Sequence, residues 1–404
     1  MISYSFKNTY FLLFFLFFFS LFSCGQSKTS KLQVDKVSFL EIISGAQQTS
    51  QYLKLIAGKN VAVVANQTSV IFKGKNSYTH LIDSLLSHKI HVSKVFSPEH
   101  GFRGNTDAGE KVIDGIDVKT EVAIVSLYGS NKKPTKEQLT AIDVVVFDIQ
   151  DVGVRFYTYI STLHYVMEAC AEQGIPVIVL DRPNPNGQYI DGPTLEMEHK
   201  SFVGMHPIPL VYGMTIGEYA QMINGEHWLK NNMKCDLTVI PLRNYNHNSE
   251  YSLPLRPSPN LPNDKAINLY PSLGFLEGTI INAGRGTENQ FQQYGAPFFP
   301  KSEFMYTPHP NFGSKDPKHN GKICYGVNLS TVERLSYVNI EWLIDAYNKT
   351  PKTEQFFGAT FTIHAGTTEL ENQIKKGFSA KEIHNSWQPK IEEFKKIRKK
   401  YLLY

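Results

Sequence analysis

Short runs of Val, Ile and other apolar residues alternate with segments of helical periodicity over the first half of the chain. A short, nearly continuous apolar run is typical of a strand buried on both faces, and apolar residues every three or four positions indicate a helix. The alternation predicts a doubly wound α/β fold around a parallel sheet. The predicted strands cover residues 60–67, 91–100, 121–129, 143–151 and 176–185, and the predicted helices cover 77–89, 135–142 and 161–174.

The pattern changes in the second half of the chain. A helix at 212–225 and a strand at 236–242 continue the first pattern, but residues 250–330 are rich in Pro, Asn, Gly and aromatic residues. This composition favours short strands joined by long ordered loops. Helical spacing returns at 379–403. The predicted domains are an α/β domain at 39–249 and a smaller C-terminal α+β domain at 250–404 that closes a cleft.

The N-terminal segment is typical of a secreted protein. Residues 11–19 form an apolar run after one basic residue, Lys7. The run is shorter than the roughly 20 residues that span a bilayer, which favours a signal peptide. It ends in LFSC, typical of a lipoprotein processing site, so we expect removal of 1–23, lipidation of Cys24 and a tether at 24–38. The protein would then lie in the periplasm on the outer membrane; an ordinary signal peptide with a chance cysteine and an anchored helix are the alternatives.

Composition and missing motifs exclude several classes of function. The net charge of the chain is only +4. Its lysines and arginines are scattered along the sequence, with one cluster, KKIRKK, near the C-terminus. No nucleic acid is therefore expected as a partner. Cys170, Cys235 and Cys324 lack paired spacing, which predicts buried thiols rather than a disulfide framework or a zinc site. No strand is followed by GxGxxG, and GxSxG, HExxH and GxxxxGK[ST] are absent. We predict neither a metal nor a cofactor.

Polar residues gather where the predicted strands end. In an open parallel sheet these carboxyl ends meet at one edge, where ligands bind. Each residue also has a structural alternative: Asp148 could cap a helix, and Asp151 could pair with Arg155. A solvated turn could account for Asp181 and Arg182. The residues that the strand ends deliver are Asn66, Glu99, His100, Arg103, Asp148, Gln150, Asp151, Arg155, Tyr157, Asp181, Arg182 and Asn184.

Six sequence motifs, in the same order along the chain, resemble those of a known family. This family was long known only as domain of unknown function 1343. It is associated with NamZ-type exo-β-N-acetylmuramidases, which are glycoside hydrolases. The resemblance covers residues 40–404 and implies a Rossmann-like domain and a smaller C-terminal domain with the active site between them. It also implies release of N-acetylmuramic acid (MurNAc) from non-reducing ends of peptidoglycan fragments. The motifs are SPEHGFRG (97–104), FDIQDVGVRFYTY (147–159), LDRPNP (180–185), PSPNLP (257–262), GRGTENQF (284–291) and YLLY (401–404).

The resemblance assigns the catalytic role to the glutamate of SPEHG, which is Glu99 in this chain. Glycoside cleavage requires an acid that protonates the leaving oxygen. A second carboxylate, Asp148 or Asp151, could act as base or nucleophile, or the 2-acetamido group of the substrate could attack with an aspartate orienting it. The sequence leaves these mechanisms open. The catalytic candidates are Glu99, His100, Asp148 and Asp151.

The expected substrate, a MurNAc–GlcNAc fragment, carries a 3-O-lactyl carboxylate that N-acetylglucosamine (GlcNAc) lacks. An arginine could bind it with two hydrogen bonds, although the same arginine could instead pair with a nearby aspartate. Phe291 and Tyr294 could stack on a sugar face or belong to the core. The arginine candidates are Arg103, Arg155, Arg182, Arg256 and Arg285. The other substrate-binding candidates are Asn66, Gln150, Tyr157, Asp181, Asn184, Asn260, Glu288 and Asn289.

Two other functions fit the same residues. A lipoprotein could bind muropeptides without cleaving them, although binding alone does not require the pair Glu99 and His100. A metal-dependent hydrolase could use Asp148, Asp151 and His100, although their spacing matches no metal signature. Metal analysis of the purified protein and an assay with β-MurNAc and β-GlcNAc glycosides would distinguish the three functions.

Overall fold

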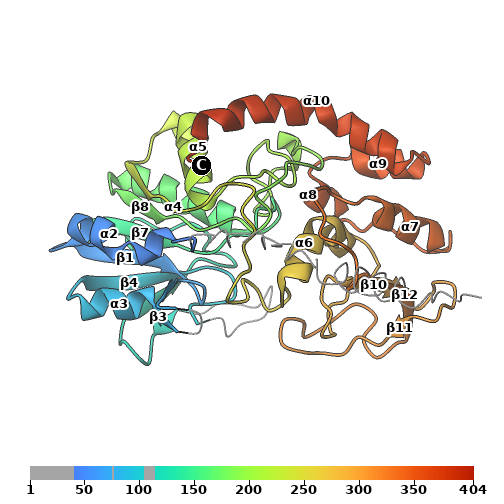
Figure 1. Cartoon of the computed structure of the whole chain (residues 1–404), viewed down its shortest axis with the longest axis horizontal. Helices are drawn as coiled ribbons and strands as arrows, with labels where there is room; N and C mark the ends of the chain where they lie inside the picture. The colour runs from blue at the N-terminus through green and yellow to red at the C-terminus, as the bar shows by residue number, and fades with distance from the viewer. Residues whose placement is uncertain (1–40, 75–76, 104–113) are drawn as a thin grey trace, which may run out of the picture. The chain divides into compact units, whose positions relative to one another are not determined.

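A seven-stranded sheet forms the centre of the N-terminal part of the computed structural model, which describes residues 41–74, 77–103 and 114–404 (Figure 1). The strand order is β5-β6-β4-β1-β7-β8-β9, and β5 runs antiparallel to β6 while the other neighbours are parallel. The parallel strands, numbered along the chain, therefore stand in the Rossmann order 3-2-1-4-5-6, which confirms the predicted fold class. The strands are β1 (Asn60–Ala65), β4 (His91–Ser97), β5 (Gly115–Ile116), β6 (Ala123–Ser126), β7 (Val144–Asp148), β8 (Val177–Leu180) and β9 (Leu237–Ile240).

Helices cover both faces of this sheet. Side chains alternate along a strand, so Val61 and Val63 of β1 pack on one face with α2 and α3, and Ala62 and Val64 pack on the other with α4 and α5. Both faces are apolar because both are buried, which explains the continuous Val/Ile runs. The helices are α2 (Thr49–Ile56), α3 (Leu81–Ser87), α4 (Tyr159–Gln173) and α5 (Ile216–Gly225).

Two predicted helices differ from the structure. Residues 135–142 form turns, because so short a segment gains too few backbone hydrogen bonds to offset the cost of starting a helix. The segment 77–89 begins with a strand, β3 (Tyr78–His80), which pairs with β2 (Val70–Phe72) before α3 starts. The remaining elements predicted in the first domain form within a few residues of their expected bounds, and α4 ends at Gly174 in the left-handed conformation.

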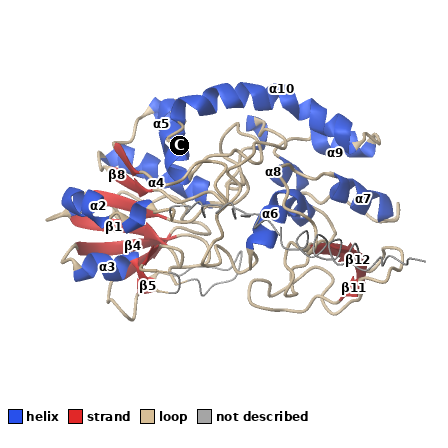
Figure 2. Cartoon of the chain, viewed as in Figure 1, coloured by secondary structure: helices blue, strands red, loops and turns tan. Residues whose placement is uncertain are grey.

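The C-terminal part is smaller and contains a separate antiparallel sheet of order β10-β12-β11, so the strands in Figure 2 form two groups. This confirms the predicted α+β character. Its elements are α6 (Asp264–Leu273), η4 (Gly274–Gly278), β10 (Gln293–Ala296), β11 (Met305–Tyr306), β12 (Cys324–Asn328), α7 (Glu341–Lys349), α8 (Phe361–Ala365), α9 (Glu369–Lys375) and α10 (Ala380–Arg398). The remaining short 3₁₀ turns are η1 (Gly45–Gln47), η2 (Met197–His199), η3 (Lys230–Asn232) and η5 (Lys399–Tyr401).

The long helix α10 returns the chain to the first domain, and in Figure 1 it extends from α9 to α5. A capping box at Ser379 and Glu382 begins the helix. Beyond η5, the Tyr404 hydroxyl donates a 2.7 Å hydrogen bond to the buried carboxylate of Asp181, directly after β8. The YLLY motif therefore attaches the chain end to the sheet edge.

Several sequence-based predictions concern other parts of the chain. Cys170, Cys235 and Cys324 are buried thiols, as predicted. Within the described ranges, no helix is both long and apolar enough to cross a membrane. Residues 1–40, with the expected signal peptide, Cys24 and the tether, lie outside the described residues. Those expectations and the domain boundary at 249/250 stay predictions.

Replacing Tyr404 by Phe should lower the free energy of unfolding by about 1–3 kcal/mol, because a buried carboxylate loses a hydrogen-bond donor. Urea denaturation measures the change. Tyr78→Phe is the matched control, since this tyrosine is 51% exposed. Equal midpoints for Tyr404→Phe and the wild type would show that the attachment to Asp181 adds nothing to stability.

Candidate active site

The loop after β4 contains the motif SPEHG. Its backbone turns sharply: the Gly101 amide donates to the Pro98 carbonyl at 3.1 Å, and both His100 (φ 73°) and Gly101 (φ 78°) are left-handed. This conformation is uncommon for a residue other than glycine and is frequently found at functional sites. The turn places Glu99 and His100 on the wall of a cavity.

The cavity has a volume of about 460 Å³ and is lined by both domains. This volume is typical of small-molecule sites. Glu99, His100, Tyr157, Asn260 and Arg285 are the predicted site residues that line it. Phe291, one of the two aromatic candidates, also lines it, whereas Tyr294 is buried and donates to Asp345. The other lining residues are Tyr128, Gly129, Lys132, Phe156, Thr158, Phe202, Val203, Ser258, Leu261, Tyr270, Glu277 and His364.

Two hydroxyl groups hold the Glu99 carboxylate. The Tyr128 hydroxyl donates to Oε1 at 2.9 Å and the Thr158 hydroxyl donates to Oε2 at 3.0 Å. Behind this carboxylate, Tyr159 lies with its hydroxyl 3.5 Å from the Glu99 carbonyl and accepts a 2.9 Å bond from Asn66. Asn66 is therefore a buried support for the loop and does not line the cavity.

A second carboxylate, Glu277 of η4, faces the same cavity from the C-terminal domain. Burial by itself would raise the pKa of the Glu277 carboxyl, but Arg285 at 2.5 Å and Lys318 lower it below the usual value. Glu277 is thus ionised near neutral pH. The sequence-based selection missed it, although it is the only charged residue between Lys265 and Arg285.

Asn260 and Tyr157 both line the cavity but offer different groups to a ligand. The Asn260 amide donates to the Gly313 carbonyl at 2.6 Å, while its Oδ1 is buried and accepts no hydrogen bond from any described residue. A sugar hydroxyl can supply that missing donor. The Tyr157 hydroxyl donates to the Pro257 carbonyl at 2.7 Å, so its ring, rather than its hydroxyl, is available to a ligand.

Asp148 and Arg182, predicted as a catalytic and a substrate-binding residue, are buried away from the cavity. Both side chains are buried, and Arg182 forms two hydrogen bonds of 2.6 and 2.8 Å with the Asp148 carboxylate. A third bond joins Arg182 to the Val70 carbonyl at 3.0 Å. Because a buried charge requires a partner, this pair is satisfied internally.

Four other predicted residues at the sheet edge are also buried and bonded within the protein: Asp151, Asp181, Gln150 and Asn184. Asp151 accepts from the Gly153 amide at 2.7 Å and from the Tyr212 hydroxyl, and burial raises its pKa to about 6. The Gln150 and Asn184 amides donate to backbone carbonyls. These four side chains shape the loops and lie outside the cavity.

The remaining candidates are also placed elsewhere. Arg155 is fully buried and donates to four backbone carbonyls, so it does not pair with Asp151. Arg103 forms two hydrogen bonds with Asp117, at 2.6 and 3.1 Å. Arg256, Glu288 and Asn289 are exposed and do not line the cavity.

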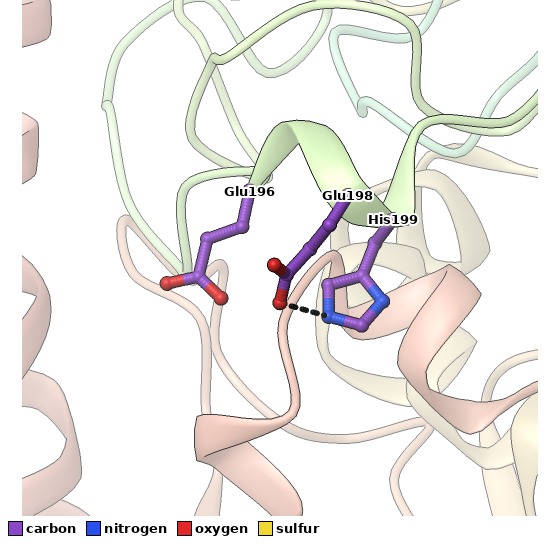
Figure 3. Close-up of side chains that lie close together, drawn as sticks. All are labelled: Glu196, Glu198 and His199. Carbon is purple, nitrogen blue, oxygen red and sulfur yellow. Dashed lines mark ion pairs between the residues drawn. The ribbon is translucent and has the colours of Figure 1, made fainter.

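The described residues contain one group with metal-ligand geometry, formed by Glu196, Glu198 and His199 (Figure 3). It includes none of the residues expected for a metal-dependent hydrolase. The Lys390 ammonium lies 2.8 Å from the Glu196 carboxylate and already supplies a positive charge there. Asp148 and Asp151, the expected ligands, lie in separate hydrogen-bond networks.

Comparison with known proteins identifies the family of the chain. Two family models match it: exo-β-N-acetylmuramidase NamZ, N-terminal, over residues 61–265, and exo-β-N-acetylmuramidase NamZ, C-terminal, over residues 268–404. The chain is 39% identical over 374 residues to the peptidoglycan β-N-acetylmuramidase NamZ of Bacillus subtilis, covering 87% of this chain and 89% of that protein. The chain belongs to the NamZ family.

Solved structures of DUF1343 proteins from Bacteroides fragilis share the same fold. One is 44% identical with a TM-score of 0.83 and another is 28% identical with a TM-score of 0.78; each match covers 90% of this chain and 99% of that chain. Membership of the NamZ family makes this chain a glycosidase of the exo-β-N-acetylmuramidase type, as the motifs predicted.

Substituting Arg182 by Met should destabilise the protein by about 3–5 kcal/mol, because Asp148 then remains buried without a cation. The double variant Arg182→Met with Asp148→Leu should recover most of this loss, since an apolar pair can replace a buried ion pair. Chemical denaturation of the single and double variants measures both effects. An Arg182→Met protein with wild-type stability but reduced cleavage of a MurNAc glycoside would instead assign Arg182 to substrate binding.

Proposed function

We propose that this chain releases MurNAc from non-reducing ends of peptidoglycan fragments, with Glu99 as the general acid. The observation that supports this role is the position of Glu99 in the inter-domain cavity, with hydroxyl groups bonded to both carboxylate oxygens. Hydroxyls can donate to a carboxylate and accept from a carboxylic acid. The two bonds can therefore persist when Glu99 carries the proton that the leaving oxygen requires.

Glu277 supports a division of roles between two carboxylates. Arg285 and Lys318 keep Glu277 ionised, and the Tyr128 and Thr158 hydroxyls bond to the Glu99 carboxylate on the opposite wall. Glycosidases commonly combine one protonated acid with one ionised carboxylate. In this proposal Glu277 replaces Asp148 and Asp151 as the second carboxylate, and it acts on the developing positive charge or on the acetamido group.

Glu99→Gln should reduce kcat by roughly 10²–10⁴-fold, the range for loss of general acid–base catalysis, because an amide cannot supply a carboxylic proton. The assay measures MurNAc released from an unactivated MurNAc–GlcNAc disaccharide. The control variant is Glu333→Gln, an exposed glutamate outside the cavity.

Near wild-type turnover by Glu99→Gln would remove Glu99 from the mechanism. If the wild type binds the disaccharide but releases no sugar, the chain is instead a non-catalytic muropeptide-binding protein.

The proposal includes attachment to the outer membrane through lipid on Cys24, because LFSC follows an apolar run. Cys24→Ala should move the protein from the membrane to the soluble periplasmic fraction, since the residue that receives the lipid is missing. Fractionation followed by immunoblotting measures the change, and Ser27→Ala in the same segment is the control. Unchanged membrane partition of Cys24→Ala would contradict lipidation.

A further inference from the structure

One corner of the cavity combines a cation with an apolar wall. Lys132, Phe202 and Val203 line it together, on the first-domain side. Phe202 and Val203 form the tip of a tight turn, in which Ser201 and Gly204 exchange backbone hydrogen bonds of 2.9 and 3.1 Å. The wall therefore has a fixed backbone.

The Lys132 ammonium is positioned by an aromatic ring. Its Nζ lies 4.8 Å from the centroid of the Phe202 ring, within the range of a cation–π interaction. Phe202 in turn stacks on Tyr165, with centroids 6.2 Å apart and planes inclined by 14°. The aromatic pair stabilises the position of the ammonium without neutralising its charge.

Lys132 differs from the arginines in its charge partners. In the described residues its ammonium forms no ion pair with a carboxylate. Arg285, the other lining residue among the lysines and arginines, is bound to Glu277 at 2.5 Å and to the Gly313 carbonyl at 3.1 Å. Of the five arginines first considered, Arg285 is the only one that lines the cavity.

Glu277 and Arg285 of the cavity wall neutralise each other, because they form an ion pair at 2.5 Å. The Lys132 ammonium has no such carboxylate partner among the described residues and faces the cavity beside the Phe202 ring. The pKa of His364 is lowered by burial, so this lining histidine adds no charge near neutral pH. A ligand carboxylate can therefore pair with the Lys132 ammonium.

We propose that Lys132 binds the lactyl carboxylate of MurNAc and thereby selects MurNAc over GlcNAc, an inference that rests on the proposed function. The lactyl group consists of a carboxylate and a methyl group on one carbon. The corner offers a matching partner to each: the Lys132 ammonium to the carboxylate and the Phe202–Val203 wall to the methyl group. The lysine ammonium is a point charge with three hydrogen-bond donors. It can bind the lactyl carboxylate through a single carboxylate oxygen, without the two-bond geometry of an arginine.

The test compares Lys132→Met and Lys132→Arg with the wild type on three chromogenic substrates: the β-MurNAc glycoside, the same glycoside with its lactyl group as an N-methylamide, and the β-GlcNAc glycoside. A charge-assisted hydrogen bond contributes about 1.5–3 kcal/mol. Lys132→Met should therefore lower kcat/KM for the MurNAc acid by roughly 10- to 200-fold, at about 1.4 kcal/mol per factor of ten.

The two uncharged substrates provide the internal control. Lys132→Met should change their kcat/KM by no more than about twofold, because neither offers a carboxylate to the ammonium. Lys132→Arg should retain most of the preference for the acid, since its positive charge remains. Lys136→Met, an exposed lysine on the same loop, should match the wild type on all three substrates.

Three outcomes would contradict the role proposed for Lys132, and the third would also contradict the proposed function. If the wild type prefers the β-MurNAc glycoside and Lys132→Met keeps the same preference, another group of the protein binds the lactyl carboxylate. An equal loss on all three substrates would show that Lys132 only maintains the shape of the cavity. If the folded wild type cleaves none of the substrates, the proposed function itself fails, and with it the role of Lys132.

Discussion

The bidentate ion pair between Asp148 and Arg182 holds together the edge of the sheet on which the cavity is built. Asp148 ends β7 and is paired with Ala65 of β1, and Arg182 follows β8. Arg182 also donates to the Val70 carbonyl of β2. One salt bridge thus connects several segments, and breaking it would leave an unpaired charge in the protein interior. Because each charge of the pair has a partner, the ion pair stabilises the strand ends from which the cavity loops start.

The polar residues at the sheet edge separate into two layers. In the inner layer Asn66, Asp151 and Asp181 find donors or acceptors inside the protein and are closed to solvent. In the outer layer Glu99 and Glu277 face the cavity. Burial explains the division: the inner side chains are enclosed by protein and cannot meet a ligand, whereas Glu99 and Glu277 line the cavity while they are bonded to donors of the protein.

The sequence predicted the strands, the sheet type and the family, because a buried strand requires a continuous apolar run and because six motifs occur in order. It also selected Glu99, since its place directly after β4 follows from the strand assignment. It did not predict which way each side chain points beyond the strand end. Asp148 is still within β7, where the alternation of side chains decides its direction, and Glu99 lies in a left-handed turn outside the strand.

Residues contributed by the second domain were harder to predict. Glu277 follows no strand, and only the tertiary fold brings it to the cavity that Glu99 lines. Its signal in the sequence was one isolated charge in an apolar segment, which indicates a buried carboxylate with a distant partner. Lys132 gave no signal, because a lysine after a strand is ordinarily a solvated surface residue.

The arrangement of the two cavity walls depends on Arg155, a buried cation that does not line the cavity. Arg155 is fully buried and donates to Pro193 and Ile208 of the first domain and to His364 and Ala365 of the second. Burial lowers its pKa to about 9, so it stays protonated near neutral pH.

A side chain at Gly366 would collide with this guanidinium, since an added Cβ would lie 2.6 Å from Nη2. Glycine at this position therefore permits the close approach of the two domains. His364, whose carbonyl Arg155 binds, also lines the cavity. A contact made entirely with backbone carbonyls thus helps to set how far the wall with Glu277 stands from the wall with Glu99 and Lys132. In the proposed mechanism, catalysis and substrate selection both depend on that separation, because the proposed acid Glu99, the ionised Glu277 and the proposed lactyl-binding Lys132 must contact one sugar at the same time.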